Sequence, residues 1–328
     1  MIHYRYYEPG DEAGIVDAWN RTLVADPITQ KRFRNLVLLD GNFDPQGLRL
    51  AVAEEQVIGV VYAVRRLMPM TGTELEPTMG WIPFFFVVPE YQGQGVGRQL
   101  MAEACAFLRG AGRELVFFAS YAPNYVLPGI DPQAYPAGLA FLKAMGFEIA
   151  YSPVAMDRSL VNFFIPEEIR HLQEQRVQEG YSFSFATDSD LVELIGFANQ
   201  SFNPDWGRAI REGVLQGLPL SRILVARDQG DLVGFAMYGA YEGIPERFGP
   251  FGVDANQRGK GIGKILLHLT LEAMRSEALH GAWFLWTGET TAAGHLYKKT
   301  GFAVTRKFHV LKKPLGSDPP KVGKKGQD

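Results

Sequence analysis

The hydrophobic and polar positions follow the same order in two places along the chain. An apolar run at residues 81–88 precedes a glycine-rich segment, and apolar residues then recur at helical spacing over residues 100–108. In the second half, an apolar run at residues 248–253 precedes another glycine-rich segment, and apolar residues follow it over residues 265–274. Each place is therefore predicted to hold a strand, a glycine turn and a helix in that order.

These two units belong to a longer internal repeat. Their glycine segments lie close to half the chain length apart, and the later segment Phe141–Phe147 resembles Leu296–Phe302, since both end in Gly-Phe. The first half is longer between its two similar segments, and the surplus fits the proline-rich residues 122–136, which predict a loop. Two similar domains in tandem account for this pattern.

We expect an N-terminal domain over residues 1–160, a linker helix within residues 161–180, a C-terminal domain over residues 181–313 and a disordered tail over residues 314–328. The linker is predicted to be helical because a proline and two acidic residues open its polar segment and a glycine follows it. The tail combines proline, glycine and lysine without an apolar periodic segment, which is typical of disorder.

Composition narrows the class of protein. A chain of 328 residues suffices for two domains, and its 46% hydrophobic and 21% charged residues are typical of a soluble globular protein. A net charge of −3 argues against a nucleic-acid partner. The single cysteine, Cys105, excludes an internal disulfide framework and a cysteine-rich zinc site, and its apolar helical surroundings predict a buried core residue.

The sequence lacks the patterns of a signal peptide, a membrane span and a metal site. The N-terminus has no signal-peptide pattern, and the apolar runs are far shorter than the ~20 residues that span a bilayer. We therefore expect a cytoplasmic protein without a membrane partner. The six histidines show no metal-ligand spacing, so no metal is expected.

The glycine segments are the strongest chemical signal. They place alternate glycines between strand and helix: Gly93, Gly95 and Gly97 in the first half, and Gly259, Gly261 and Gly263 in the second. Glycine permits positive φ and close approach of a ligand to the backbone, and a helix N-terminus favours negative charge. A pyrophosphate is the natural occupant. Neither segment fits the dinucleotide fingerprint or the P-loop, and tight packing of helix on strand is the alternative explanation.

The pattern V-x-[PA]-x-x-[QR]-x-x-G-x-G, followed by a helix and later by Gly-Phe, resembles the GNAT N-acetyltransferase superfamily. Both halves carry it, so the resemblance implies two tandem GNAT domains in an α/β (α+β) fold, each a mixed, mostly antiparallel sheet flanked by helices. It also implies that acetyl-CoA is the acyl donor and that the glycine turn holds its pyrophosphate.

The resemblance assigns binding residues by position. Val87 and Val253 match a bulged strand whose backbone holds pantetheine and polarises the thioester carbonyl, and such an amide stabilises charge in the tetrahedral intermediate. The residues implied to hold the pyrophosphate are Gln92, Gly93, Gln94, Gly95, Val96, Gly97 and Arg98 in the first half, and Arg258, Gly259, Lys260, Gly261, Ile262, Gly263 and Lys264 in the second.

The two halves differ at a position that the family uses for catalysis. A tyrosine five residues before the phenylalanine of Gly-Phe often serves as general acid to the departing CoA thiolate. Tyr297 matches this position, whereas the first half has Leu142 there. Tyr135, at the start of the corresponding helix, is a possible substitute. The resemblance thus implies that the second half does the chemistry.

A general base could take a proton from the acceptor amine. In some members of the family a glutamate on the strand before the glycine turn does this, and Glu246 is the nearest candidate. Glu242 and Asp254 are alternatives, and the first half has Gly80 at the offset of Glu246. A base is not obligatory if the amine loses its proton before it binds.

We therefore predict an acetyl-CoA-dependent N-acetyltransferase that moves the acetyl group to a primary amine by direct transfer in a ternary complex, since the sequence shows no set of nucleophile, base and orienting residue. The acceptor is a small-molecule amine or a peptide N-terminus, and the chain is a monomer or a homodimer. The alternative is a non-catalytic acyl-CoA-binding sensor or interaction module.

Overall fold

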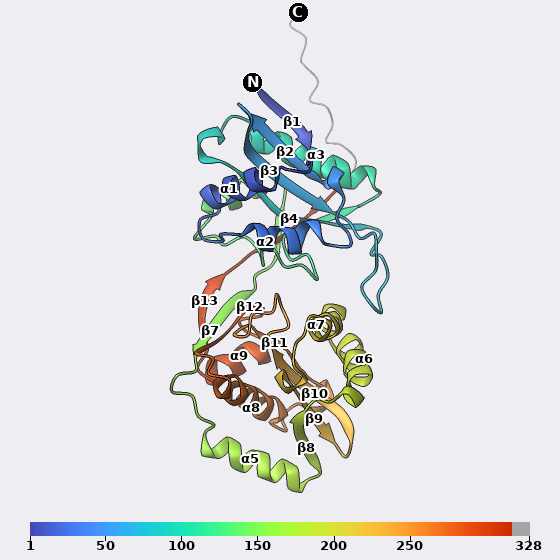
Figure 1. Ribbon diagram of the computed structural model, residues 1–328, viewed down its shortest axis with the longest axis vertical. Helices are drawn as coiled ribbons and strands as arrows, with labels where there is room; N and C mark the ends of the chain where they lie inside the picture. The colour runs from blue at the N-terminus through green and yellow to red at the C-terminus, as the bar shows by residue number, and fades with distance from the viewer. Residues whose placement is uncertain (317–328) are drawn as a thin grey trace, which may run out of the picture. The chain divides into compact units, whose positions relative to one another are not determined.

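The computed structural model describes residues 1–316 and divides into two units, each with its own sheet and helices (Figure 1). Among the described residues, the N-terminal unit contains Met1–Met68, Leu75–Tyr151 and residues 309–316. The C-terminal unit contains Pro69–Glu74 and Ser152–Phe308. The predicted tandem arrangement of two mixed α/β domains is confirmed.

The N-terminal unit is built on one seven-stranded sheet. Its strands lie in the order β1 (Ile2–Tyr6), β2 (Leu48–Ala53), β3 (Gln56–Val64), β4 (Met79–Val87), β5 (Leu115–Phe118), β14 (Val310–Pro314) and β6 (Glu148–Tyr151). All neighbouring strands are antiparallel except β4 and β5, which are parallel. The helices of this unit are α1 (Glu12–Thr22), α2 (Gln30–Phe33), α3 (Val96–Gly110) and α4 (Pro136–Ala144).

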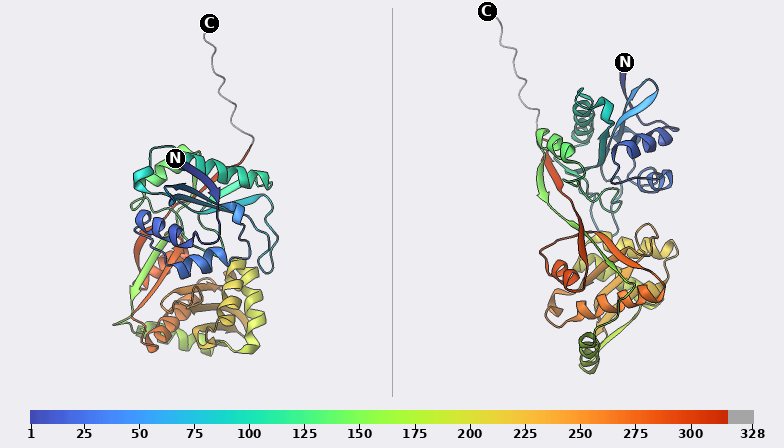
Figure 2. Two further views of the ribbon diagram at one scale, coloured as in Figure 1. Left: turned by 45° about the horizontal axis from the view of Figure 1, so that its top comes forward. Right: turned by 90° about the vertical axis from the view of Figure 1, so that its left-hand side faces the viewer.

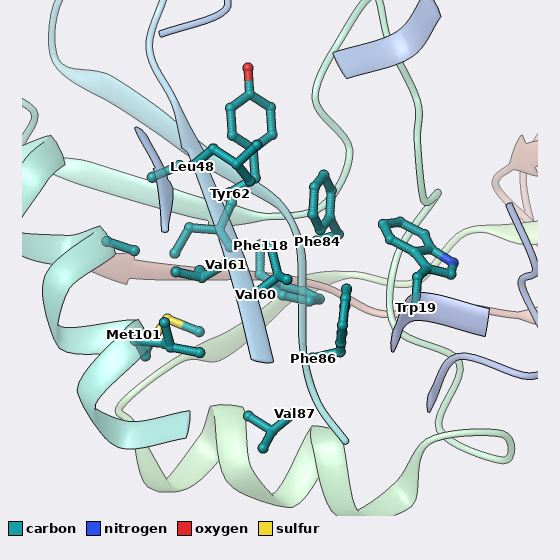
Figure 3. Close-up of a cluster of buried hydrophobic side chains, with 14 of the residues drawn as sticks. Trp19, Leu48, Val60, Val61, Tyr62, Phe84, Phe86, Val87, Met101 and Phe118 are labelled. Carbon is teal, nitrogen blue, oxygen red and sulfur yellow. The ribbon is translucent and has the colours of Figure 1, made fainter. Parts of the chain in front are cut away.

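Helices cover both faces of this sheet (Figure 2). On one face Trp19 of α1 packs against Phe84 and Phe86 of β4, with ring centroids 4.8 and 5.7 Å apart. On the other face α3 buries its apolar stripe, which includes Met101 and Cys105. Figure 3 shows Trp19 and Met101 on opposite sides of the central strands. The predicted burial of Cys105 is confirmed.

The C-terminal unit repeats this strand order but divides it into two sheets. The first sheet runs β8 (Tyr181–Phe185), β9 (Ile223–Asp228), β10 (Asp231–Tyr238) and β11 (Phe248–Val253), and the second runs β12 (Gly281–Thr287), β7 (Val154–Ser159) and β13 (Ala303–Lys307). The helices are α5 (Glu167–Gln178), α6 (Leu191–Ser201), α7 (Pro204–Leu215), α8 (Ile262–Ser276) and α9 (Ala292–Lys299).

The two halves of the chain exchange one strand. β7 follows the N-terminal unit in sequence but pairs with β12 and β13, and Met156 is buried in the C-terminal core. β14 follows the C-terminal unit but lies between β5 and β6, where Leu311 joins the N-terminal core. In the right-hand view of Figure 2, β14 (red) runs beside β6 (green). The division therefore differs from the predicted boundaries at residues 160 and 313.

The predicted linker helix and part of the predicted tail belong to the two units. Helix α5 lies within the segment predicted to be a linker helix, but it belongs to the C-terminal unit and buries Ile169 there. Of the predicted tail, Pro314 ends β14 and Leu315 is buried, whereas residues 317–328 lie outside the described part of the chain. No helix within residues 1–316 is long and apolar enough to cross a membrane.

Candidate active site

The first glycine segment forms the predicted turn between a strand and a helix. After β4 ends at Val87, a short 3-10 helix (η3, Pro89–Tyr91) leads to Gly93 and Gly95, and α3 begins at Val96. The φ angles of Gly93 and Gly95 are 74° and 86°, a left-handed conformation that favours glycine. Gly95 is the N-cap of α3, so the amides of the first helical turn have no intrahelical acceptor and face a ligand or solvent.

The second glycine segment has the same geometry. A short 3-10 helix (η6, Ala255–Gln257) follows β11, and the φ angles of Gly259 and Gly261 are 82° and 79°. Gly261 is the N-cap of α8. The prediction of strand, glycine turn and helix is thus confirmed in both units.

The third glycine of each segment has a packing role. A Cβ on Gly97 would lie 3.0 Å from the ring of Phe85, and one on Gly263 would lie 3.4 Å from the ring of Phe251. These glycines let the helix approach the preceding strand. The side chains of Val96 and Ile262 are buried in the cores, so only backbone amides at these two predicted positions can reach a ligand.

The turn of the N-terminal unit is open. No atom lies within 4 Å of a Cβ built on Gly93 or Gly95, and the side chains of Gln92, Gln94 and Arg98 are exposed. Gln92 donates from its side-chain nitrogen to the carbonyl of Val87 at 2.8 Å, which closes the turn onto the strand. This turn has the shape and exposed amides that a pyrophosphate requires.

The turn of the C-terminal unit is covered by α5. Leu172 of α5 lies 2.7 Å from the position that a Cβ of Gly261 would take. Arg176, also in α5, donates to the carbonyl of Lys260 at 2.7 Å, and the Lys260 ammonium donates to the hydroxyl of Tyr181 at 2.8 Å. The side chains of Arg258 and Lys264 remain exposed. The predicted residues are assembled here too, but beneath a helix.

In each unit the strand before the turn parts from its parallel neighbour. The pairs of β4 and β5 extend only from Met79 and Leu115 to Ile82 and Phe118, although β4 continues to Val87. In the C-terminal unit only Arg247 and Trp283 form a parallel bridge before β11 and β12 separate. Beyond these pairs, backbone N–H and C=O groups of β4 and β11 on that edge lack a strand partner within residues 1–316, so a ligand can bond to them.

The bulge lies earlier than predicted. On β4 the register shifts between the pairs Tyr62–Phe84 and Val64–Trp81, whereas Val87 is regularly paired with Gly59. On β11 the register shifts between the pairs Ala236–Phe251 and Tyr238–Phe248, and Val253 is regularly paired with Gly234. The expectation that Val87 and Val253 sit at a bulge is therefore wrong, because the extra residue is accommodated nearer the middle of each strand.

Tyr297 lies in an aromatic environment in α9. Its ring is 4.5 Å from that of Phe284 and 6.1 Å from that of Phe251 on β11, measured between centroids, and the side chain is buried. Burial raises the pKa of the Tyr297 hydroxyl above its usual range, so the group stays protonated at neutral pH. A protonated hydroxyl beside the strand that leads to the glycine turn is suited to donate a proton.

The corresponding positions of the N-terminal unit lack this donor. Leu142 is buried in the core. The hydroxyl of Tyr135 donates to a carboxylate oxygen of Asp26 at 2.8 Å, so its proton is already engaged.

Each of the three candidate bases, Glu242, Asp254 and Glu246, interacts with another group of the chain. Glu242 forms an ion pair with Arg247 at 3.0 Å, and the carboxylate of Asp254 accepts from the amide of Asn256, which caps η6. Glu246 contributes a favourable charge to Arg222, whose guanidinium bonds to Glu277.

The position of Glu277 shows where Glu246 lies. Glu277 is the C-cap and Gly261 the N-cap of α8, a helix of 15 residues, so the two caps are about 24 Å apart at 1.5 Å per residue. Glu246 is thereby associated with the end of α8 that is remote from the glycine turn. In the first half no side chain fits the equivalent place, because a Cβ on Gly80 would lie 2.7 Å from Leu108.

The sequence analysis missed a cluster of buried polar side chains in the N-terminal unit. Asp40, Asn42, Tyr62 and Tyr121 are all buried, and Asn42 donates to the hydroxyl of Tyr121 at 2.8 Å. These residues are distant in sequence, and only the close pair of Asp40 and Asn42 after an apolar segment offered a signal.

Comparison with known proteins agrees with this geometry. A family model described as acetyltransferase (GNAT) family matches residues 15–126, and one described as acetyltransferase (GNAT) domain matches residues 219–304. A curated relative, mycothiol acetyltransferase of Propionibacterium freudenreichii subsp. shermanii, is 27% identical over 158 residues. That alignment covers 45% of this chain and 51% of the relative, about half the length of each.

Solved structures resemble the whole chain in fold. A GCN5-related N-acetyltransferase from Sphaerobacter thermophilus superposes with a TM-score of 0.72 at 16% identity, covering 96% of both chains. A GCN5-related glucosamine N-acetyltransferase region of a fungal multi-domain β-N-acetylglucosaminidase gives 0.79 at 18% identity, covering 95% of this chain and 38% of that one. A tandem GNAT protein from the clavulanic acid biosynthesis pathway gives 0.63 at 15% identity, covering 97% and 100%. Together with the two family matches, these likenesses show that the chain belongs to the GNAT acetyltransferases and carries one GNAT domain in each half.

Proposed function

We propose that this protein is an acetyl-CoA-dependent N-acetyltransferase that moves an acetyl group to a primary amine by direct transfer in a ternary complex. The observation that carries the proposal is the pair of left-handed glycine turns, each at the N-terminus of a long helix and each following a strand that parts from its neighbour. A turn of this kind presents several amides to one anion, as a CoA pyrophosphate requires.

The binding roles follow from which groups reach the turn. Backbone amides at positions 92–98 in the first half and 258–264 in the second hold the pyrophosphate, with the exposed side chains of Arg98 and Lys264 beside them. Backbone groups of β4 and β11 on the edge that lacks a strand partner bind pantetheine and donate to the thioester oxygen.

In the proposed transfer, the acceptor amine displaces the CoA thiolate from the acetyl group. The neutral amine nitrogen attacks the thioester carbonyl carbon, a C–N bond forms, and the C–S bond of the tetrahedral intermediate then breaks. Tyr297 gives its proton to the departing thiolate, and the proton released by the amine restores the phenol through solvent. Glu246 is retained as the proposed base only through intervening water, because the structure associates it with the remote end of α8.

We place the acceptor among small-molecule amines or peptide N-termini, and the protein in the cytoplasm as a monomer or homodimer without a nucleic-acid or membrane partner. The names of two similar proteins, a mycothiol acetyltransferase and a glucosamine N-acetyltransferase region, support a small-molecule acceptor.

A non-catalytic acyl-CoA-binding module is the second candidate. It is favoured by the cover of α5 over the second turn, since Leu172 lies against Gly261. Turnover of acetyl-CoA against a panel of primary amines, measured by release of free thiol, separates the two. Thiol release that depends on an amine supports the enzyme, whereas acetyl-CoA binding without release for any amine supports the module.

A further inference from the structure

The N-terminal unit contains a buried polar cluster, which we call the Asp40 cluster and define as Asp40, Asn42, Tyr62 and Tyr121. Asn42 connects it: its amide nitrogen donates to the Tyr121 hydroxyl at 2.8 Å, and its backbone amide donates to Oδ1 of Asp40 at 3.0 Å. The side-chain oxygen of Asn42 accepts from the backbone amides of residues 67 and 68. Asn42 is therefore held in place from several directions.

Two polar atoms of this cluster have no partner. Oδ2 of Asp40 and the hydroxyl of Tyr62 are fully buried and form no hydrogen bond with any described residue. Asp40 is 6% exposed and Tyr62 1% exposed. A buried carboxylate oxygen or hydroxyl without a partner is costly, and folded proteins satisfy most such groups. A hydrogen-bond donor from outside the chain, such as a ligand or a water, would satisfy these two atoms.

The charge at this place is negative. Burial, followed by the negative charge of Asp40, raises the pKa of the hydroxyls of both Tyr62 and Tyr121, so both stay protonated. A hydrogen bond with the Asp40 carboxylate raises the pKa of Tyr121 further, which leaves Oδ2 of Asp40 as the unpartnered oxygen. Within residues 1–316 no cationic side chain lies within 4 Å of the Asp40 carboxylate. The nearby guanidinium of Arg66 is neutralised in an ion pair with Glu76.

The cluster lies beside the place where β4 and β5 part. Tyr62 stands opposite Phe84 of β4, next to the register shift, with ring centroids 5.6 Å apart. Tyr121 follows β5 and packs against Trp81 of β4 at 5.5 Å. Figure 3 shows the Tyr62 hydroxyl at the margin of the apolar cluster, directed away from its hydrocarbon side chains. The unpartnered atoms therefore adjoin both aromatic rings and the free strand edge.

We propose that the Asp40 cluster binds the ammonium group of a primary amine with an apolar body, which gives the N-terminal unit an acceptor site of its own. An ammonium offers three donors, which match Oδ2 of Asp40 and the Tyr62 oxygen, and its charge compensates that of Asp40. The rings of Tyr62 and Phe84 provide apolar surface and favourable faces for a cation, whereas the ring of Trp81 already carries the guanidinium of Arg66 at 4.9 Å. Interpreting the site as one for acceptors depends on the proposed function, but the binding itself does not.

The test is calorimetric titration of the full chain with phenethylamine, a primary ammonium ion at pH 7, without acetyl-CoA. Phenethyl alcohol, which has the same apolar body without the charge, should bind at least about 10-fold more weakly. Asp40→Asn should weaken binding of phenethylamine by about 10- to 100-fold, the range of a charge-assisted hydrogen bond. Tyr62→Phe, which removes one oxygen and keeps the ring, should weaken it by less. Asp44→Asn is the matched control, because Asp44 lies nearby but is paired with Arg65.

The outcomes separate this inference from the proposed function. The inference is overturned if phenethylamine binds equally well to wild type, Asp40→Asn and Tyr62→Phe. It is also overturned if a folded wild type does not bind phenethylamine at all. Either result leaves a buried water as the partner of Asp40. Binding that depends on Asp40, together with no acetyl transfer to any amine, supports the inference and contradicts the proposed function. Amine-dependent acetyl transfer, together with phenethylamine binding that is unchanged in Asp40→Asn, supports the proposed function and contradicts the inference.

Discussion

The two units share a strand order and a glycine turn, yet they differ in what surrounds the turn. In the N-terminal unit the turn is open at Gly95, and a buried carboxylate lies near the strand that leads to it, but Leu142 replaces the proton donor. In the C-terminal unit Tyr297 is present and protonated, but Leu172 covers Gly261. The two backbones share one geometry at the turn, while the side chains around it differ.

Helix α5 covers the second turn with one apolar and one charged side chain. Leu172 contacts Gly261 through the end of a flexible side chain, and Arg176 brings a guanidinium to the carbonyl of Lys260. The same guanidinium is paired with Glu179, so the second turn is bordered by an ion pair as well as by Leu172. The comparison therefore predicts two sites of unequal accessibility.

The largest effect is expected from the proton donor. Tyr297→Phe should lower turnover by about 10²–10⁴ with little change in affinity for acetyl-CoA, because a proton donor acts in the transition state. Tyr135→Phe is the control and should have much less effect, since its hydroxyl is bonded to Asp26. Thiol release with one responsive amine measures both. If Tyr135→Phe is the impaired enzyme and Tyr297→Phe is normal, the first unit does the chemistry.

The exchanged strands should transmit damage to the opposite unit. Leu311→Ala, near the end of the chain, should lower the free energy of unfolding of the N-terminal unit by about 2–5 kcal/mol, because Leu311 is fully buried there. Met156→Ala should do the same to the C-terminal unit. Amide hydrogen exchange locates each effect. Faster exchange in β12 and β13 after Leu311→Ala would contradict the strand assignment.

The glycine turns should lose affinity for acetyl-CoA on substitution. Gly95→Glu places a carboxylate at the proposed pyrophosphate position and should weaken binding to the first unit by about 100-fold, as expected when charge-assisted hydrogen bonds are lost. Gly261→Glu should do so in the second unit and should also displace Leu172.

Matched controls separate lost binding from backbone strain. Gly112 and Gly217 have φ angles of 77° and 95° and no atom within 4 Å of a Cβ, so Gly112→Glu and Gly217→Glu impose the same strain elsewhere in each unit. Calorimetric titration of the four variants decides the matter. Affinity lost equally in turn and control variants would assign the effect to misfolding.

The smallest effect concerns pH and only the C-terminal unit. Burial lowers the pKa of His268 in α8, so the unfolded chain binds a proton more readily than the folded one. Stability from this group is complete above a pH of about 6.5 and is lost as pH falls below it, by at most ~1.4 kcal/mol per pH unit. Among neighbouring charges, Arg158 lowers and Glu168 raises the pKa of His268.

Melting temperatures at pH 7.5 and 5.5 test this. His268→Gln should remove part of the loss in stability at pH 5.5, whereas His280→Gln, which alters an exposed side chain, should not. Equal losses in wild type and His268→Gln would show that other groups govern the acid sensitivity.

Local patterns predicted the parts of the fold that are local. The strand, glycine turn and helix occupy contiguous residues, so the sequence specifies them directly. The strand exchange was missed because Val154–Ser159 and Val310–Pro314 are short strands whose patterns do not say which sheet receives them. Pairing partners are selected by packing at long range.

The site divides in the same way. The turn residues were predicted because glycine spacing encodes backbone conformation. The role of Glu246 stays a prediction, because counting along a strand does not reveal that its charge acts on Arg222 near the end of α8. The proximity of Asp40 to Tyr62 arises only when the loop after η1 (Arg34–Leu38) meets the later part of β3.

The exchange of β14 has a consequence for biosynthesis. Phe118 of β5 pairs with Leu311, so the N-terminal sheet stays incomplete until Leu311 has been made. At about 5–20 residues per second, ribosomes take roughly 10–40 s to synthesise the intervening segment. During that time β5 and β6 each expose an unpaired edge, which invites association with other nascent chains. The N-terminal unit therefore emerges before the C-terminal unit but is completed after it.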